Sequence, residues 1–269
     1  MKTVAFIGTG SLGSEIVRAV CRRTEPSEVC ITTRDQKRAA ALAEECGCVM
    51  SQGGQAAARG AKFIVLGVKD SEVCGVLREI ASVLTPEQVI VPMSAGVGAE
   101  EIHAALGTQN PVIRALPSLS CEVGRGMMLI VPCGEADGEL VDELRDLFSG
   151  CGTVGVTDEG HARAAMMLEG CVPAFTYMLI EALTDGAVHA GLDRASAMVW
   201  SSHAVAGAAQ MALETGRHPA ALRDECCIPG GAAIEGVKTL EEHGFRAAVI
   251  DAVDELYKRL SRKAEHEKT

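Results

Sequence analysis

The chain has 269 residues and a formal net charge of -11 at pH 7. Its length favours two domains, each large enough for an apolar core of its own. The acidic charge argues against nucleic acid or an anionic membrane surface as a partner, because both need clustered Lys and Arg. The one dense basic run, residues 258–263, lies beside Glu265 and Glu267 and is typical of a solvated helix end.

The first half alternates short apolar runs with helical patterns. Strands are expected over residues 3–8, 28–33, 62–67, 88–92, 112–115, 127–131 and 153–156. Helices are expected between them, over residues 12–23, 37–45, 71–84 and 139–149. This alternation is typical of βαβ units joined by right-handed crossovers. The predicted fold class is therefore α/β, with a Rossmann-like, doubly wound parallel sheet in residues 1–158.

After residue 158 the strand signals end, and runs rich in Ala, Met, Leu and Glu continue. Helices are expected over residues 162–190 and 196–215, with stops at Gly191 and Gly216. Pro173 should kink the first of these helices or begin a new one, because proline cannot donate the helical hydrogen bond.

The second predicted domain, residues 159–269, is all helical. Its span 195–213 contains no charged residue and is apolar around most of its circumference. Such a helix is usually buried on several sides, which predicts a subunit interface in this domain. The same span contains Ser, His, Gln and Gly, which suit burial in protein better than burial in lipid. No membrane association is expected.

Eleven cysteines are scattered through apolar runs without CxxC spacing. They are interpreted as small core residues kept reduced, since a chain of this size needs no disulfide framework. No metal site is expected, because the adjacent Cys226 and Cys227 cannot easily ligate one zinc ion and no matching His spacing follows. The chain begins with an apolar strand rather than a targeting signal. These features predict a cytoplasmic protein.

Residues 4–13, VAFIGTGSLG, fit the pattern GxGxxG between a strand and a helix. Gly8 would make the tight turn, Gly10 would let the backbone approach a pyrophosphate, and Gly13 would let the helix pack on the strand. The helix N-terminus offers free amides and a positive dipole to the anion. The alternative is a glycine-rich turn without a ligand. The residues expected to bind a dinucleotide here are Gly8, Thr9, Gly10, Ser11, Leu12 and Gly13.

The end of the second predicted strand favours NADP as the cofactor. Thr33 and Arg34 can receive a 2′-phosphate, with Lys37 and Arg38 nearby. An enzyme that favours NAD usually places Asp or Glu at this strand end, and Asp35 leaves NAD possible. The alternative is that these basic residues form only the solvated start of a helix.

Further motifs follow the glycine loop in order along the whole chain. They are Val68-Lys69, the turn SAGV at 94–97, FTYMLIEAL at 175–183, LETGRHPAALRD at 213–224, PGG at 229–231 and LEEHGFRAAVIDA at 240–252. In these motifs the chain resembles the pyrroline-5-carboxylate reductase family. The resemblance implies NAD(P)H-dependent reduction of a cyclic imino acid, pyrroline-5-carboxylate, to proline. It also implies a Rossmann domain, a helical domain that dimerises by intertwining, and often a ring of dimers.

The resemblance also implies where the substrate and the cofactor bind. In the family the substrate carboxylate lies on backbone amides of the Pro-Gly-Gly loop, and a Thr just after the loop hydrogen-bonds the ring nitrogen. The implied substrate-binding residues are Pro229, Gly230, Gly231, Ala232, Ala233 and Cys171. The further implied cofactor-binding residues are Val68, Lys69, Ser94, Ala95 and Gly96. Lys69 is interpreted as positioning the cofactor, and Asp70 stands where the family commonly has Pro.

Three segments depart from the family pattern. The loop T/C-S/T-P-G-G-T-T reads CIPGGAA at residues 227–233, so the hydroxyl partner of the ring nitrogen is absent. The motif M-P-N-T-P reads LPSLS at residues 116–120, and S-G-S-G-P-A-Y reads EGCVPAF at residues 169–175. These segments meet at one pocket in the family. We therefore expect an unchanged scaffold with an altered, more apolar pocket.

Glu169 is the carboxylate that these changes add to the pocket. We hypothesise that it is partly desolvated, has a raised pKa, and pairs with an iminium nitrogen or supplies its proton. Glu169 and Lys69 are thus the candidate catalytic residues. The alternative is that Glu169 caps a helix or forms a surface salt bridge. Two other functions stay open: a diverged paralogue that reduces a different imine or carbonyl compound, and a non-catalytic dinucleotide-binding regulatory protein.

Overall fold

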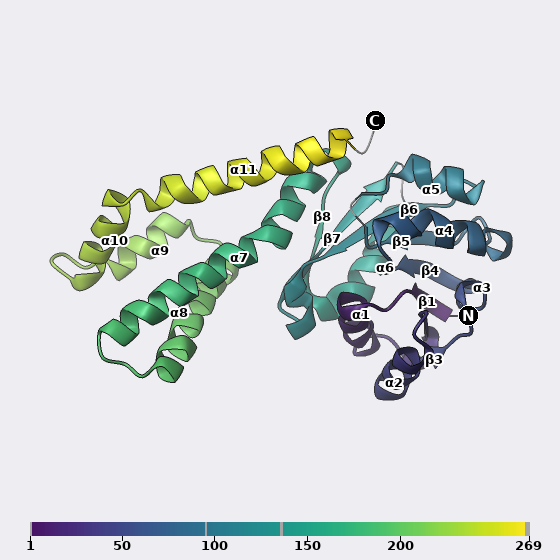
Figure 1. Cartoon of the computed structure of the whole chain (residues 1–269), viewed down its shortest axis with the longest axis horizontal. Coiled ribbons are helices and arrows are strands. Elements are labelled where there is room, and N and C mark those ends of the chain that lie inside the picture. Colours follow the sequence, from purple (N-terminus) through teal and green to yellow (C-terminus); the bar gives the residue numbers. More distant parts are fainter. Residues whose placement is uncertain (1, 95, 135–136, 267–269) are drawn as a thin grey trace. The chain divides into compact units, whose positions relative to one another are not determined.

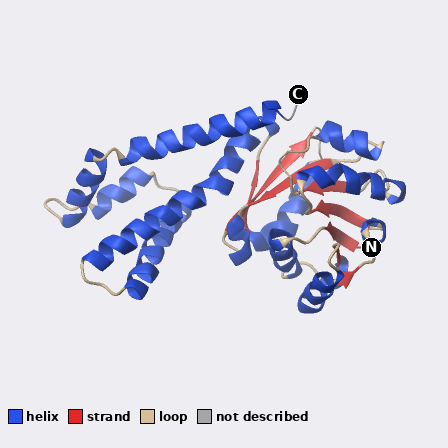
Figure 2. Cartoon of the chain, in the orientation of Figure 1, coloured by secondary structure: helices blue, strands red, loops and turns tan. Residues whose placement is uncertain are grey.

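The computed structural model describes residues 2–94, 96–134 and 137–266, and Figure 1 shows their helices and strands. The chain forms two compact units, one ending at Gly170 and the other beginning at Cys171. The first unit contains all the described strands, and the second consists of helices joined by loops (Figure 2). The predicted order, an α/β half followed by a helical half, is confirmed.

The first unit is built on one sheet, whose described strands lie in the order β3-β2-β1-β4-β5-β6-β7-β8. Neighbouring strands are parallel except β6 and β7, which are antiparallel. The predicted strands are confirmed to within two residues at each end, and the two-residue β3 was not predicted. The strands are β1 Lys2–Ile7, β2 Val29–Thr32, β3 Val49–Met50, β4 Ala61–Leu66, β5 Val89–Pro92, β6 Val112–Pro117, β7 Gly126–Cys133 and β8 Gly152–Val156.

The antiparallel pair corrects the prediction of an all-parallel sheet. Only residues 118–125 connect β6 to β7, and they contain the short 3-10 helix η3, Leu119–Val123. A parallel crossover needs a dozen or more residues, usually a helix. The connection is too short for that, so β7 runs back beside β6.

Helices cover both faces of the sheet, as a doubly wound fold requires. Successive side chains of a strand point to opposite faces, and β1 shows the result. Val4 and Phe6 are buried with α1, α2 and α6, whereas Ala5 and Ile7 are buried with α3, α4 and α5. The helices are α1 Ser11–Cys21, α2 Gln36–Cys46, α3 Gly54–Ala58, α4 Asp70–Ile80, α5 Ala99–Leu106 and α6 Gly138–Phe148.

The sheet brings the ends of β1, β2 and β4 together. The last residue of β1, Ile7, pairs with Thr32 of β2 on one side and with Leu66 of β4 on the other. The segments that follow these three strands therefore meet at one edge. The strand order changes direction between β1 and β4, and doubly wound sheets bind ligands at such a switch point.

Helix α7 runs from Glu159 to His189 and passes through Pro173. Proline has no backbone N–H, so Pro173 removes one helical hydrogen bond, the one that another residue at this position would donate to the carbonyl of Glu169. The helix continues on both sides, so the possibility of a new helix beginning at Pro173 is wrong.

The first turns of α7 belong to the first unit. Ala162 is buried against Leu116 of β6, and the guanidinium of the buried Arg114 forms an ion pair with Glu159. Glu159 also accepts a hydrogen bond from the thiol of Cys133 at 2.9 Å, and burial together with this carboxylate raises the pKa of Cys133 to about 12. These contacts explain why the compact unit extends past the predicted boundary at residue 158 and ends inside α7.

The second unit continues with four described helices, α8 Arg194–Thr215, α9 Pro219–Cys226, α10 Ala232–Glu242 and α11 Phe245–His266. Gly216 ends α8 in the left-handed conformation with φ 61°, as its sequence position predicts. Among the described helices, α7 is the one long and apolar enough to cross a membrane by length and composition. A helix whose apolar sides are covered by another protein chain can have the same composition.

Candidate functional site

The glycine loop, residues 8–13, links β1 to α1. Gly8 has a φ of 91°, a left-handed conformation that favours glycine. Its N–H donates to the carbonyl of Thr32 at 2.9 Å, and a Cβ on Gly8 would lie 2.6 Å from Cγ1 of Val68. Gly8 therefore holds the loop between the ends of β2 and β4, where no side chain fits.

The other two glycines of the loop have different surroundings. A Cβ on Gly13 would lie 3.2 Å from the carbonyl oxygen of Gly8, so α1 packs closely on the loop. A Cβ on Gly10 would meet nothing within 4 Å. Gly10 is the N-cap of α1, and it offers no side chain to cap the helix amides. Open space beside uncapped N-terminal amides is what a bound pyrophosphate requires.

A cavity of about 430 Å³ opens beside this loop. Its walls come from the glycine loop, the end of β2, the segment after β4, and α4. Thr9 lines it, and the buried Oγ1 of Thr9 has no hydrogen-bond partner among the described residues, which leaves a polar atom for a ligand. The predicted cofactor residues that line the cavity are Gly8, Thr9, Gly10, Thr33, Arg34, Val68 and Lys69.

Five described residues of the predicted cofactor set are not among those that line this cavity: Ser11, Leu12, Gly13, Ser94 and Gly96. Ser11 and Leu12 line a second cavity of about 330 Å³, whose walls include α1 and α2. They follow Gly10 at the start of α1, so their backbone amides still belong to the uncapped helix N-terminus. Their predicted contribution to dinucleotide binding would therefore come from the backbone.

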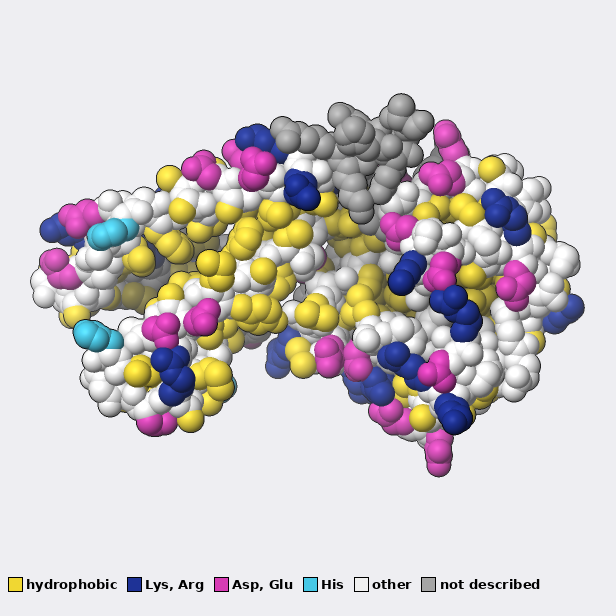
Figure 3. Space-filling model, viewed as in Figure 1, with side chains coloured by type: hydrophobic (Ala, Val, Ile, Leu, Met, Phe, Trp, Pro, Cys, Tyr) yellow, Lys and Arg dark blue, Asp and Glu magenta, His cyan; other side chains and the backbone are white. Residues whose placement is uncertain are grey.

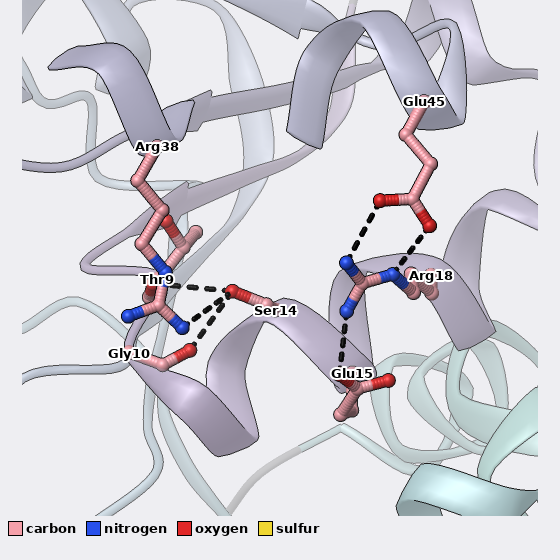
Figure 4. Close-up of polar contacts among 7 residues, drawn as sticks. All are labelled: Thr9, Gly10, Ser14, Glu15, Arg18, Arg38 and Glu45. Carbon is pink, nitrogen blue, oxygen red and sulfur yellow. Dashed lines mark hydrogen bonds and ion pairs between the residues drawn. The ribbon is translucent and has the colours of Figure 1, made fainter. Parts of the chain in front are cut away.

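Ser14 connects the glycine loop to α2 (Figure 4). Its Oγ–H is directed at two carbonyl oxygens of the loop, at 2.9 Å for Gly10 and 3.2 Å for the preceding residue, and its Oγ accepts from Nη2 of Arg38 at 3.3 Å. One turn further along α1, Nε of Arg18 donates to Glu45 of α2 at 2.7 Å. Sequence reasoning missed Ser14, because a serine in the first turn of a helix is common without any ligand.

The charges at the end of β2 bear on the choice of cofactor. Nη2 of Arg34 lies 2.7 Å from Oε1 of Glu72 in α4, and the Arg34 side chain is 88% exposed. Asp35 is the N-cap of α2, and its Oδ1 accepts the backbone N–H groups of Lys37 and Arg38, both at 3.1 Å. Asp35 therefore serves the helix, and Arg34 is the residue of this strand end whose charge borders the cavity.

The segment after β5 is held by Asp70, the first residue of α4. Oδ1 of Asp70 accepts the hydroxyl of Ser94 at 2.8 Å, and Oδ2 accepts the N–H of Gly96 at 3.1 Å. A Cβ on Gly96 would lie 2.3 Å from Oδ2, so a side chain at this position would displace the Asp70 carboxylate. Ser94 and Gly96 are thus fixed to the start of α4 beside Lys69, while the predicted Ala95 lies outside the described residues.

Glu169 lies in the part of α7 that belongs to the first unit. Its side chain is half-buried, and burial raises the pKa of its carboxyl. No residue in the described part of the chain forms a hydrogen bond or an ion pair with this carboxyl. This argues against the alternative in which Glu169 forms a surface salt bridge. The pKa of the Cys121 thiol in η3 is lowered chiefly by a hydrogen bond with Cys151, and the charge of Glu169 acts on it in the opposite direction. The charge of Glu169 therefore acts on the segment after β6.

The Pro-Gly-Gly loop belongs to the second unit, as does Cys171, which is half-buried in α7. The N–H of Gly231 donates to the carbonyl of Ile228 at 2.9 Å, which closes a turn around Pro229, and Gly230 has a φ of 71°. Gly231 is the N-cap of α10, and it has no side chain to cap the amides from Ala232 onward. The loop therefore presents uncapped amides, which can bind a carboxylate.

Two family models match separate parts of the chain. One, described as "NADP oxidoreductase coenzyme F420-dependent", matches residues 3–96. The other, described as "Pyrroline-5-carboxylate reductase dimerisation", matches residues 159–263. The first match covers the glycine loop and its cavity, and the second covers α7 to α11 with the Pro-Gly-Gly loop.

Similar proteins align with nearly the whole chain. Pyrroline-5-carboxylate reductase of Escherichia coli (strain K12) is 36% identical over 254 residues, 94% of either chain, and that of Methanosarcina acetivorans is 32% identical over 252 residues, 93% of either chain. The solved pyrroline-5-carboxylate reductase of Coxiella burnetii superposes with a TM-score of 0.91 at 26% identity, covering 99% of this chain and 98% of that one. The NADP-bound enzyme of Plasmodium falciparum shares the fold, with a TM-score of 0.82, 21% identity and coverage of 100% and 98%. From these alignments, the chain belongs to the pyrroline-5-carboxylate reductase family.

Proposed function

We propose that the chain reduces a cyclic imino acid with NADPH, and that its substrate is pyrroline-5-carboxylate, which becomes proline. One observation carries the proposal: Gly10 leaves open space beside uncapped helix amides, in a cavity that Arg34 borders. The relatives that align over nearly the whole chain are named for this reduction. We assign dinucleotide binding to residues 1–158, and substrate binding and dimerisation to residues 159–269.

The residues that border the cavity would hold the cofactor. Amides of the glycine loop would bind the pyrophosphate, and Thr33 with Arg34 would bind the 2′-phosphate of NADPH. Lys69, on the wall of the same cavity, would add a positive charge close to the phosphates. When bound, NADPH supplies the hydride. NADH lacks the 2′-phosphate and would use the same loop without the contribution of Arg34.

The remaining candidate residues would hold the substrate and its proton. Uncapped amides at the start of α10, those of Ala232 and Ala233, would bind the substrate carboxylate, because the N–H of Gly231 is already bonded to Ile228. Glu169 would pair with the iminium nitrogen or give it a proton. A hydride on carbon and a proton on nitrogen convert C=N into CH–NH, so the reaction needs no other reactant. The protein's main contribution would be to position the reactants.

The apolar loop favours a second candidate substrate. Ile228 is 67% exposed, and Ala232 and Ala233 carry no hydroxyl group that could bond a ring nitrogen. A six-membered cyclic imino acid carries the same ring nitrogen and one more methylene group, which the exposed apolar side chain of Ile228 would suit, so it is the second candidate.

A substrate panel tests the proposal. Purified protein would receive NADPH with five-membered and six-membered cyclic imino acids and with carbonyl compounds, and the loss of NADPH absorbance would be followed. Proline formed from pyrroline-5-carboxylate supports the proposal, and a preference for the six-membered ring selects the second candidate. Protein that binds NADPH but oxidises it with no imine or carbonyl compound contradicts the enzymatic proposal and favours a regulatory function.

Replacing Ala232 with Thr is expected to raise kcat/KM for pyrroline-5-carboxylate about tenfold. The new hydroxyl would bond the ring nitrogen, a contribution of about 1–3 kcal/mol for a buried polar atom, and about 1.4 kcal/mol corresponds to a factor of ten. Steady-state kinetics would measure the change. Ile234→Thr, which adds the same side chain further along α10, is the control and should leave kcat/KM unchanged. An Ala232→Thr enzyme with the parent's kcat/KM contradicts the assigned role of this position.

We also propose that the helical unit forms a homodimer and that dimers assemble further into a ring. Large apolar side chains are exposed on its helices, and Figure 3 shows hydrophobic side chains gathered there. Patches of this kind mark interfaces in soluble proteins. Sedimentation equilibrium should give a mass that is a multiple of the dimer, and a monomer at micromolar concentration contradicts the proposal. Within this unit, the large apolar side chains on helices that are at least 50% exposed are Tyr177, Met178, Met198, Trp200, Met211, Leu213 and Ile250.

We propose a cytoplasmic location as well. All eleven cysteines are free thiols, which is the state expected in a reducing compartment. Cell fractionation that finds the protein outside the cytoplasm contradicts this.

A further inference from the structure

We propose that Glu72 is a determinant of cofactor specificity, because it holds the guanidinium of Arg34 and competes with the 2′-phosphate of NADP for it. The proposal rests on the dinucleotide site proposed above. Oε1 of Glu72 lies 2.7 Å from Nη2 of Arg34, and both residues line the 430 Å³ cavity. Arg34 follows β2 and Glu72 lies in α4, so the ion pair joins two walls of the cavity.

The competition follows from the chemistry of guanidinium groups. Arginine binds a phosphate most strongly through two parallel N–H groups. One terminal nitrogen of Arg34 is already bonded to Glu72. A 2′-phosphate must therefore displace this carboxylate or accept a poorer geometry, and it must tolerate a negative charge nearby. A cofactor without the 2′-phosphate has no such requirement. Glu72 therefore weakens the binding of NADP but not that of NAD, and the difference between the two affinities becomes smaller.

The position of Glu72 distinguishes it from the neighbouring carboxylates. Asp35 caps α2, and Asp70 holds Ser94 and Gly96, so both are occupied. Glu79 lines the same cavity, but it forms no ion pair among the residues that the structure describes. Glu72 alone among these carboxylates contacts the cation expected to bind the phosphate.

Two nucleotide probes isolate this effect without any turnover. Adenosine 2′,5′-bisphosphate carries the 2′-phosphate, and adenosine 5′-monophosphate does not. Removing an exposed ion-pair competitor strengthens binding by a factor of up to about five. In calorimetric titrations, Glu72→Gln should bind the bisphosphate about fivefold more tightly and the monophosphate as the parent does. Glu79→Gln, which removes the same charge from the same cavity but not from the partner of Arg34, is the matched control and should strengthen bisphosphate binding less than Glu72→Gln does.

A second pair of variants tests whether Glu72 acts through Arg34. In an Arg34→Met background, Glu72 has no guanidinium to hold. If Glu72 acts through Arg34, the effects of the two substitutions are not additive, and Glu72→Gln should then change bisphosphate binding by less than about twofold. Equal effects with and without Arg34, weaker bisphosphate binding by Glu72→Gln, or an effect of Glu79→Gln as large as that of Glu72→Gln would each overturn the proposal. If the parent binds neither probe, the dinucleotide site fails as well. If it binds them as expected but reduces no imine, only the proposed reaction fails.

Discussion

Gly10→Ala is expected to weaken NADPH binding about 10–100-fold while the protein stays folded. A methyl group on Gly10 would occupy the open space where the backbone is expected to approach the pyrophosphate. Overpacking of this kind costs about 1–3 kcal/mol, and about 1.4 kcal/mol is a factor of ten in affinity. The backbone at Gly10, with φ -65° and ψ -169°, is allowed for alanine. Titration of NADPH into the variant measures the loss.

Gly8→Ala is the comparison that separates binding from folding. Its φ of 91° is unfavourable for alanine, and the added Cβ would lie 2.6 Å from Val68 and 2.8 Å from the carbonyl oxygen of Gly67. We therefore expect Gly8→Ala to lose about 1–3 kcal/mol of unfolding free energy as well as NADPH binding. Urea unfolding at a fixed protein concentration would measure both variants, because an oligomer's stability depends on concentration.

The pair of results decides whether the cavity is a dinucleotide site. Gly10→Ala protein that unfolds at the parent's urea concentration but no longer binds NADPH supports the site. Gly10→Ala protein that binds NADPH as tightly as the parent places the pyrophosphate elsewhere. Equal destabilisation by both substitutions would show that the open space beside Gly10 belongs to the fold rather than to a ligand.

The sheet could be predicted because its strands are short apolar runs that end at glycine or polar residues. The run at Val4 to Ile7 is buried on both faces, and this lack of alternation marks a central strand of a parallel sheet. In the first unit, the strand and the α-helices that escaped prediction, β3, α3 and α5, are two, five and eight residues long. Such lengths are too short to establish a period.

The candidate site was predictable where it rests on backbone and unpredictable where it rests on tertiary contacts. The glycine loop follows a local spacing that forces a turn at Gly8, and the structure has that turn. The contact between Arg34 and Glu72 exists only because β2 and β4 flank β1, which brings the segment after β2 beside α4. No local pattern marks Glu72 among the acidic residues of α4.

Glu169→Gln is expected to lower kcat for imine reduction about 100-fold or more, with little change in NADPH binding. General acid catalysis contributes about 10²–10⁴-fold, and glutamine cannot donate a carboxylic proton. The carboxyl is half-buried and has no described hydrogen bond to protein, so its proton is available to a ligand. Glu181→Gln, an exposed carboxylate on the same helix, is the control. Steady-state kinetics with saturating NADPH measures the effect, and a Glu169→Gln enzyme with the parent's kcat removes the hypothesis.

The pH dependence of kcat distinguishes proton donation from a structural role. Burial raises the pKa of Glu169 above its ordinary value of 4.5, so its proton persists to higher pH than in an exposed glutamic acid. As a donor, Glu169 acts in its protonated form, and kcat should fall as the pH rises through this raised pKa. In Glu169→Gln, kcat should be lower and should no longer fall over this pH range. A limb that persists unchanged in the variant belongs to the substrate or to another group, whereas a lower kcat with the parent's pH profile assigns Glu169 to positioning.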